Sequence, residues 1–398
     1  AGLRLGATVL EAAPVPGGLC TGYVSDGFTF DYTGHLWHFA DPGLQAQVEE
    51  WLGEAMLRQQ RHAGVWFRGA MVPYPFQLAL YQLPEAVAKD IVVGVQRARL
   101  ADELPLAADF AAAARQRLGD GIVTHFLEPY LGKLLQHDLS AVLAAPMLRF
   151  LPLPDHAAIL RSYLAPAAFA GYNATYYYPR GGNRRVIHAL ARRVPGLRTG
   201  ARVTAIDPQR RMVRVNAAEE LAYDRLIVTA PLDRVLAMTS GAPPAAALRA
   251  AGIVGLNLGV RGPAPLPQHW VYYPEREYPF YRVGCYSNFA PELAPARCYA
   301  LYVELPLAWW QAVPAAARQA QVLTALCAAG WLRDAADIVV FSPQVIDPAY
   351  VVPTPAGEAQ RQDGLAWLRA QGVEMLGRYA MWDYLGMDDV LAAALRLE

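Results

Sequence analysis

One short segment near the N-terminus restricts the possible folds more than any other part of the chain. Residues 7–10 (ATVL) have the pattern of an apolar strand that ends in Glu11, and Gly17 and Gly18 follow shortly after it. In a dinucleotide-binding α/β fold, an acidic residue at the end of the second strand binds a ribose hydroxyl. Two adjacent glycines let the backbone approach a pyrophosphate or a flat ring, because no Cβ intervenes. The segment therefore predicts an α/β fold with a dinucleotide site.

The other half of such a site is not found in the sequence. The acidic residue normally follows a G-x-G-x-x-G loop by about 20 residues. Only ten residues precede Glu11, and they contain no such loop. Since residues 1–3 (AGL) read as the end of a helix, we expect a fragment whose first strand, glycine loop and most of the first helix lie upstream. Taken alone, Glu11 is also compatible with an ordinary surface carboxylate after a strand.

The composition is that of an apolar globular protein. Hydrophobic residues make up 54% and charged residues 18% of the 398 positions, and the formal net charge is zero. Without a basic excess or a charged tail, we expect no nucleic-acid partner. The sequence contains no run of 18 apolar residues, so we expect no membrane span. No signal peptide precedes the first strand. The four cysteines form no C-x-x-C pair, which favours reduced thiols in a cytoplasmic protein.

Different periodicities alternate along the chain. Residues 85–145 have the Ala/Leu-rich spacing of helices, whereas residues 253–305 alternate in the manner of antiparallel strands. A second dinucleotide-fold segment begins at residues 179–182 (PRGG) and leads into a helix. We therefore expect a dinucleotide-binding domain that two insertions interrupt. Its predicted ranges are 1–75, 180–245 and 335–398, with a helical insertion at 76–146 and a mostly antiparallel β substrate domain at 147–179 and 246–334.

The C-terminal segment predicts a second contact with an anionic group. Residues 377–389 (GRYAMWDYLGMDD) place a glycine-containing loop directly before a helix N-terminus. The backbone N–H groups and the dipole of a helix start favour negative charge. A reduced flavin is negative at its N1/C2 oxygen edge and suits such a position. The simpler interpretation is a C-terminal helix that Asp388 or Asp389 caps.

In this order, the motifs resemble one family from Ala7 to the C-terminus. E-x5-GG is followed by GHLWH (34–38), PYPF (73–76), PYLGK (129–133), a helix led by two glycines, YPFYRV (278–283) and GRYAMWDYLGMDD. The chain resembles the UDP-galactopyranose mutase branch of the FAD-dependent amine oxidase and protoporphyrinogen oxidase superfamily. The closing G-R-x5-Y-x2-M-D pattern is the most specific part, whereas E-x5-GG is common to FAD proteins. The resemblance implies FAD and a Rossmann-like FAD-binding domain, here without its N-terminal glycine loop.

The resemblance also implies which residues bind the cofactor. Glu11 would bind the adenosine ribose, Val203 would contact the adenine region through its backbone, and Arg378 would lie along the cofactor. The glycine loop would line the flavin and the pyrophosphate, and the last helix would present its first residues to the flavin. The full implied set is Glu11, Gly17, Gly18, Leu19, Val203, Arg378, Met387 and Asp388.

Four residues match catalytic positions of the mutases. His35 and His38 match the histidine loop beside the flavin, and Arg282 and Tyr384 match residues that contact the substrate diphosphate. Histidines at i and i+3 could also be core residues or half of a metal site. Because no third ligand of fitting spacing stands nearby, we expect no metal. Tyr130 matches a tyrosine on the substrate side.

The chain departs from the mutase pattern at substrate positions. Leu135 stands where a Trp is expected, and Leu153 stands where an arginine grips the sugar nucleotide, which leaves Arg149 as the basic residue of that segment. Losing an arginine–phosphate contact removes a strong charge-assisted bond. Tyr176 and Tyr178 either line the substrate cleft or pack in a sheet. The same two interpretations apply to Tyr172, Tyr177, Trp270, Tyr272 and Tyr273.

Three hypotheses about function follow. The first is an FAD-dependent oxidoreductase of the protoporphyrinogen oxidase or amine oxidase type, acting on a small molecule by hydride removal. The second is an isomerase in which reduced flavin attacks the anomeric carbon of a nucleotide sugar without net redox change. The third is a truncated chain that does not hold FAD. The departures at Leu135 and Leu153 favour the first over the second.

Overall fold

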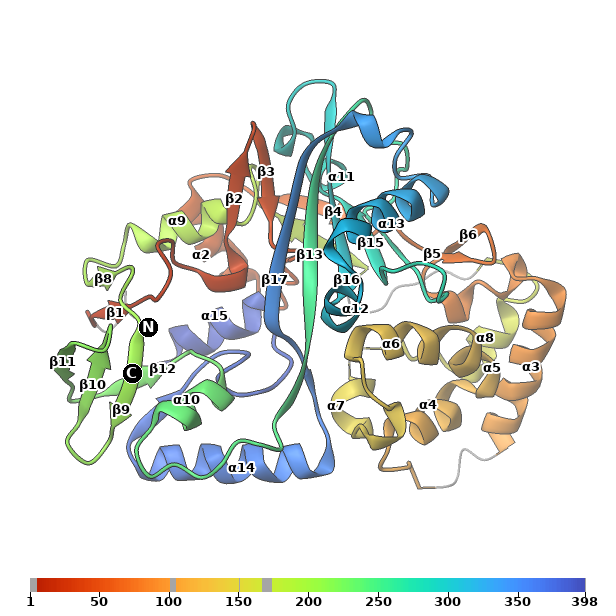
Figure 1. Cartoon of the computed structure of the whole chain (residues 1–398). Helices are drawn as coiled ribbons and strands as arrows, with labels where there is room; N and C mark the ends of the chain where they lie inside the picture. Colours follow the sequence, from red (N-terminus) through yellow and green to blue (C-terminus); the bar gives the residue numbers. More distant parts are fainter. Residues whose placement is uncertain (1–5, 101–104, 150, 167–173, 398) are drawn as a thin grey trace.

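The computed structural model describes residues 6–100, 105–149, 151–166 and 174–397. Its elements form a mixed α/β fold in which a large sheet stands above a group of helices, with a smaller α/β part beside them (Figure 1). None of the helices among these residues is long and apolar enough to cross a membrane. The helix end predicted at residues 1–3 lies outside the described residues.

Among the described residues, seven strands form one sheet in the order β17-β13-β16-β15-β14-β5-β6. Neighbouring strands are antiparallel, except that β14 and β5 run parallel. The bounds are β5 Ala63–Phe67, β6 Ala70–Pro73, β13 Arg249–Arg261, β14 Trp270–Tyr272, β15 Arg282–Cys285, β16 Cys298–Pro306 and β17 Ile338–Val352. The antiparallel alternation predicted from residue 253 onward is therefore confirmed.

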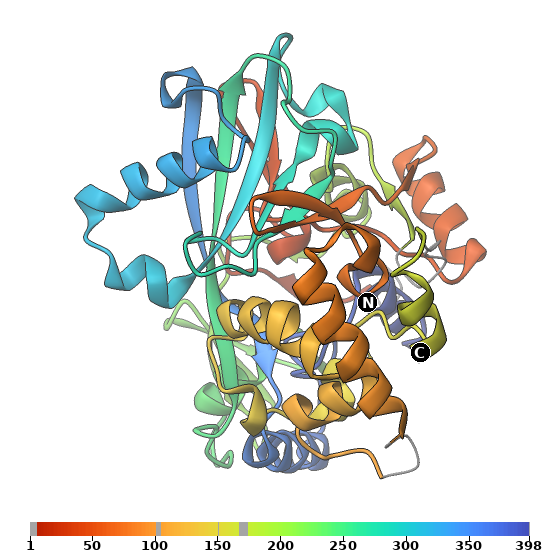
Figure 2. The same cartoon turned by 90° about the vertical axis from the view of Figure 1, so that its right-hand side faces the viewer.

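The two faces of β13 are covered by different parts of the chain. Val254, Leu256, Leu258 and Val260 belong to one apolar cluster with side chains of α13 (Ala315–Ala328). On the other face, a Cβ at Gly255 would lie 2.5 Å from the Tyr32 carbonyl oxygen, and one at Gly259 would lie 2.7 Å from the Phe28 ring. Glycine at these positions lets the chain around β3 (Phe28–Asp31) lie directly on the sheet. Figure 2 shows α12 (Leu307–Ala312) and α13, in light blue, standing out from one side of it.

The hairpin that precedes the candidate site forms as its sequence predicts. Strands β2 (Gly22–Ser25) and β3 pair in antiparallel register, with Ser25 opposite Phe28. Asp26 and Gly27 between them have φ angles of 49° and 82°. Positive φ at both central residues is the geometry that an Asp-Gly turn favours.

Helices gather below the sheet, as the spacing of residues 85–145 predicts (Figure 1). Their helical turns also continue to residue 161, beyond the range from which they were expected. The elements are α3 Glu85–Leu100, α4 Phe110–Leu118, α5 Asp120–Ile122, a π-helical turn at Val123–Leu127, α6 Glu128–Leu135, α7 Ala144–Leu148 and α8 His156–Arg161. Buried side chains from α3, α4 and α6 join the main apolar core.

Another group of elements forms the left and lower part of Figure 1. Short parallel pairs join β1 to β8 and β12 to β18, and β9, β10 and β11 form an antiparallel meander. The strands are β1 Val9–Leu10, β8 Leu197–Arg198, β9 Val203–Asp207, β10 Met212–Val215, β11 Glu219–Ala222, β12 Leu226–Val228 and β18 Val373–Met375. The helices are α9 Arg184–Ala191, α10 Leu232–Met238, α14 Pro355–Ala370 and α15 Met387–Leu395.

Shorter elements connect these parts: α2 Pro42–Leu52, β4 Leu57–Gln60, β7 Thr175–Tyr178 and α11 Tyr286–Phe289, with β4 paired to β7. The large sheet takes β5, β6 and β17 from ranges that the sequence assigns to the dinucleotide-binding domain, and the other strands from the predicted substrate domain. The domain boundaries themselves stay predictions.

Candidate active site

A buried carboxylate holds the chain just before the predicted histidine loop. Asp31, at the end of β3, accepts hydrogen bonds from the Tyr178 hydroxyl at 2.7 Å and from the Asn183 side-chain amide at 2.7 Å. The Asn183 amide also donates to the His35 carbonyl at 2.8 Å, and its oxygen accepts from the Trp37 indole at 2.8 Å. Burial raises the pKa of Asp31 to about 7. Asp31 and Asn183 thus tie β3, the histidine loop and the start of α9 together.

The two histidines of this loop are held in different surroundings. Burial, together with the nearby guanidiniums of Arg378 and Arg282, lowers the pKa of His35 to about 4. His35 is therefore neutral at physiological pH and lies near two cations. The pKa of His38 is also lowered by burial, and its Nδ1 atom lies 3.3 Å from the Thr175 carbonyl. Among the described residues, no cluster of His, Cys, Asp and Glu could hold a metal ion.

The glycine pair forms a turn against α9. Gly17 has a φ of 109°, and a Cβ there would lie 2.6 Å from the Ile187 side chain. Gly18 has a φ of 54°, and a Cβ there would have no described atom within 4 Å. The backbone of Gly18 thus borders open space, whereas Leu19 packs against the main apolar core. The following residue, Cys20, lies near Arg378, which opposes the rise that burial causes in the pKa of its thiol.

Glu11 lies at the predicted end of a parallel strand. Its carboxylate accepts a hydrogen bond from the Ala13 N–H at 2.7 Å. Its backbone carbonyl accepts from Ala201 N–H at 2.8 Å, two residues before Val203, where β9 begins. Glu11 and Val203 therefore lie in neighbouring stretches of chain.

The N-terminus of α15 packs against the histidine loop. The Asp389 side chain caps the helix by accepting from the Gly386 N–H at 2.8 Å. Burial raises the pKa of Asp388, while backbone N–H groups that include that of His38 oppose the rise. Met387 packs against an apolar cluster that contains Trp37. Asp389 therefore caps the last helix, as the simpler interpretation of this segment predicts. The start of the same helix lies beside the histidine loop.

A buried ion pair lies among buried tyrosines. The Arg282 guanidinium donates to the Glu304 carboxylate at 2.5 Å and to the Tyr350 hydroxyl at 3.3 Å. Burial disfavours the charged guanidinium, but the Glu304 carboxylate raises the pKa of Arg282 well above its usual value. Tyr130 packs edge-on against Tyr272, with ring centres 5.2 Å apart. Tyr74, Tyr272 and Tyr302 further surround this pair.

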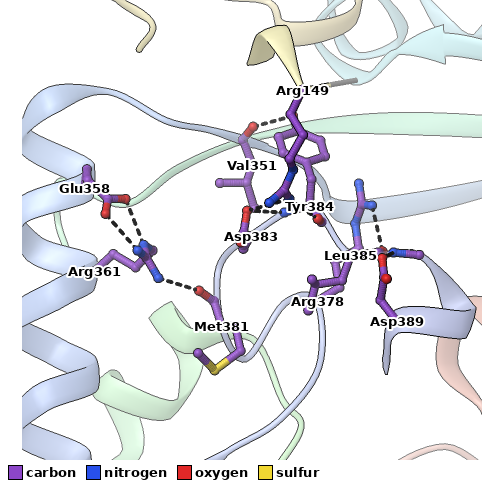
Figure 3. A network of polar contacts seen from close by, with 11 residues as sticks. Arg149, Val351, Glu358, Arg361, Arg378, Met381, Asp383, Tyr384, Leu385 and Asp389 are labelled. Atoms are coloured by element: carbon purple, nitrogen blue, oxygen red, sulfur yellow. Dashed lines mark hydrogen bonds and ion pairs between the residues drawn. The ribbon is translucent and has the colours of Figure 1, made fainter. Parts of the chain in front are cut away.

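The loop that carries Tyr384 contacts β17 through Val351 and the end of α7 through Arg149 (Figure 3). Its hydroxyl donates to the Val351 carbonyl at 2.6 Å, and the Arg378 guanidinium lies 4.9 Å from the centre of its ring. The Arg149 guanidinium donates to the Tyr384 carbonyl at 2.6 Å and lies 3.5 Å from the Asp383 carboxylate. Arg149 therefore binds the backbone of the loop that carries Tyr384.

Other predicted substrate residues lie in the core or at the surface. Tyr176 and Tyr178 are fully buried, and the Tyr176 hydroxyl lies 2.8 Å from Nδ1 of His269. This favours the packing interpretation for both tyrosines. Leu135 is buried, whereas Leu153 is 44% exposed. Tyr172 lies outside the described residues.

Sequence reasoning missed several residues of this region. Asp31 and Asn183 follow recognisable signals, because one precedes the GHLWH motif and the other follows Gly181 and Gly182. Glu304 gave no local signal, since it stands within an apolar strand. Arg61 was also missed; its guanidinium lies 4.6 Å above the Tyr74 ring.

Comparison with known proteins identifies the family and the fold of the chain. A family described as flavin containing amine oxidoreductase matches residues 1–291. A reduced UDP-galactopyranose mutase is 26% identical, with a TM-score of 0.87 over 96% of this chain and 85% of that one. A putative protoporphyrinogen oxidase from Exiguobacterium sp. 255-15 is 16% identical, with a TM-score of 0.73 over 97% of this chain and 90% of that one.

A double mutant of putrescine oxidase is 14% identical, with a TM-score of 0.63 over 99% of this chain and 94% of that one. The family match covers well over half of the chain, and these folds confirm the predicted α/β class. The resemblance drawn from the motifs is confirmed as well. The chain belongs to the flavin-containing amine oxidoreductase family.

Proposed function

We propose that this protein binds FAD and oxidises a small organic substrate in the region around Arg282. Glu11 and Val203 would hold the adenosine half, and Gly17, Gly18 and Leu19 would line the pyrophosphate and flavin. Arg378, Met387 and Asp388 would complete the flavin side. When bound, FAD accepts a hydride from the substrate.

The residues present fit such a cofactor. The left-handed backbone at Gly18 faces open space, so its N–H and Cα border a region that a Cβ would enter. The helix start at α15 lies beside the histidine loop, where its N–H groups favour negative charge. The Arg378 cation lies near both Cys20 and His35. Together these groups favour a reduced, anionic flavin.

The observation that carries the proposal is the ion pair of Arg282 with Glu304. Glu304 is 0% exposed and Arg282 is 18% exposed, so their charges compensate each other. A diphosphate would need positive charge that this pair does not supply. A small organic substrate without a diphosphate fits this tyrosine-rich region better. His35 stays neutral there and can exchange a hydrogen bond without adding charge.

The test is an anaerobic reductive half-reaction. The flavin-loaded full chain is mixed separately with putrescine, protoporphyrinogen and UDP-galactopyranose, and the visible flavin absorption is followed. Bleaching by one of the first two compounds, with product formed in equal amount, supports the oxidoreductase. If UDP-galactopyranose is converted only by pre-reduced enzyme and no acceptor is consumed, the oxidoreductase proposal is wrong.

A redox-neutral, mutase-like isomerase acting on a nucleotide sugar is the second candidate. The specific support is the TM-score of 0.87 and the 26% identity to the reduced UDP-galactopyranose mutase. Arg282, Arg378 and Tyr384 meet around the same region, as a sugar phosphate would require. In this case Glu304→Gln should strengthen binding of UDP by leaving Arg282 uncompensated. Under the oxidoreductase proposal UDP binds to neither protein.

A further inference from the structure

A cavity of about 670 Å³ lies where the ends of β17 and α7 meet α14 and the loop that carries Tyr384. Its volume falls in the range of about 300–1,000 Å³ that is usual for sites of drug-sized ligands. Tyr384 and Arg149 line it, whereas within the described part of the chain His35, Arg282 and Arg378 do not. Tyr384 therefore borders this cavity and also contacts Arg378 of the candidate active site.

The wall of the cavity is mostly apolar and its charges cancel. Apolar lining residues include Leu106, Leu143, Pro146, Val351, Pro353 and Trp382. Arg361 is held by both carboxylate oxygens of Glu358, at 2.8 and 2.7 Å, and Arg149 lies 3.5 Å from Asp383. Because these two ion pairs leave the wall without a net charge to attract an ionic ligand, the cavity favours an uncharged ligand.

The loop that borders the cavity contains a strained residue. Trp382 has a φ of 52°, which is unusual for a bulky side chain, and it is 5% exposed. Arg361 of α14 donates to the Met381 carbonyl at 3.3 Å, and Arg149 donates to the Tyr384 carbonyl at 2.6 Å (Figure 3). The residues on both sides of the strained position are thus clamped by two arginines of the cavity wall. Strain of this kind persists only where surrounding contacts hold it.

We propose that this cavity binds an uncharged, mainly apolar small molecule and that its occupancy stabilises the loop carrying Tyr384. A ligand there would contact Trp382 and would restrain both clamping arginines. On the opposite side, the Tyr384 ring lies against Arg378. Occupancy of the cavity would therefore change substrate affinity in the candidate site without a contact to the substrate.

The binding test uses the full chain with its flavin and the uncharged dye Nile red, whose fluorescence rises in apolar surroundings. Ala145 lines the cavity from an exposed position on α7, so Ala145→Trp fills space without touching the core. The matched control is Ala316→Trp on α13, which is also exposed and lies outside the lining. We expect saturable one-to-one binding that becomes roughly tenfold weaker in A145W and stays unchanged in A316W. Equal affinity in both variants, or no saturable binding, would overturn the site.

The coupling is tested by hydrogen exchange of the backbone amides in residues 378–386. With Nile red bound, these amides should exchange several-fold more slowly in the wild type, and at the same subsaturating dye concentration the effect should be much smaller in A145W. Binding without slower exchange would retain the ligand site and overturn its link to Tyr384. Neither readout depends on the oxidoreductase proposal.

Discussion

At the scale of single residues, two glycines with similar backbones and similarly open surroundings differ in the role that we propose for them. Gly18 has a φ of 54° and Gly53, at the end of α2, has a φ of 76°; among the described atoms, nothing lies within 4 Å of a Cβ at either. Gly18→Ala and Gly53→Ala should each lower the free energy of unfolding by about 1 kcal/mol, because both force an L-residue into the left-handed region. Chemical denaturation of both apoproteins measures this.

The two variants should differ in flavin content. The Cβ of Gly18→Ala would enter the space in which we place the cofactor, whereas Gly53 ends α2 and is not among the residues that we assign to the cofactor. Purified G18A should therefore retain much less FAD than G53A, as measured by visible absorption. Equal flavin content in the two variants would place the cofactor elsewhere.

Asp31 makes stability depend on pH in a defined direction. Its pKa is about 7 in the folded protein and 3.8 in the unfolded reference. Between these pH values the folded form binds more protons, so this carboxyl makes the free energy of unfolding fall as pH rises from about 4 to 7. The pKa difference corresponds to a change on the order of 4 kcal/mol.

Asp31→Asn should remove this slope, although it also loses hydrogen bonds and is less stable at every pH. Urea unfolding of the wild type and D31N at pH 5, 6, 7 and 8 provides the comparison. Histidines with lowered pKa values act in the opposite direction in both proteins, so the difference between the two curves isolates Asp31. A difference that stays constant with pH would contradict the assignment.

At the scale of elements, a lysine joins α6 to the loop between β14 and β15. The Lys133 ammonium donates to the carbonyls of Tyr273, Tyr278 and Phe280 at 3.0, 2.9 and 3.2 Å, and also to that of Glu275. Hydrogen bonds to a charged group contribute about 1.5–3 kcal/mol. Lys133→Met should therefore lower the free energy of unfolding by about 2–3 kcal/mol.

The chain supplies its own control, since Lys89 and Lys133 are its two lysines. Lys89 forms an exposed ion pair with Glu85 on α3. Such pairs contribute little, so Lys89→Met should change stability by less than about 0.5 kcal/mol. Thermal and urea unfolding of K133M and K89M test the contrast, and similar losses in both would show that Lys133 does not join the two elements.

At the scale of the whole molecule, the candidate cofactor site is assembled from distant segments. Glu11, His35, Val203 and Arg378 come from parts of the chain that only the complete fold brings together. Bound FAD should therefore raise the free energy of unfolding of the whole protein. The expected increase is about 2.7 kcal/mol at a free FAD concentration 100 times its dissociation constant. Differential scanning calorimetry of the apoprotein at increasing FAD concentrations measures this, with G18A as the control.

An unchanged melting temperature at all FAD concentrations would favour the third hypothesis, in which this chain does not hold the cofactor. A melting temperature that rises with FAD concentration would exclude that hypothesis.

Much of the molecule could be predicted from local patterns. The Asp26–Gly27 hairpin, the helical spacing after residue 85 and the alternation after residue 253 are local properties, and each formed as expected. The α/β class was predicted from a short apolar strand that ends in Glu11 and from the two glycines that follow it. Both glycines have a positive φ, which glycine adopts most readily. The family followed from the order of several motifs, which needs no knowledge of contacts.

Other features depended on residues far apart in the sequence. The sequence alone could not place Glu304 beside Arg282, since their pairing depends on the register of β15 with β16. Nor could it show that Arg149 binds the Tyr384 backbone, or that Tyr176 and Tyr178 are buried. Local sequence determined which elements form, whereas burial, charge compensation and the cavity behind Tyr384 were decided by tertiary packing. The physical reason is that desolvation and ion pairing depend on neighbours that no local pattern encodes.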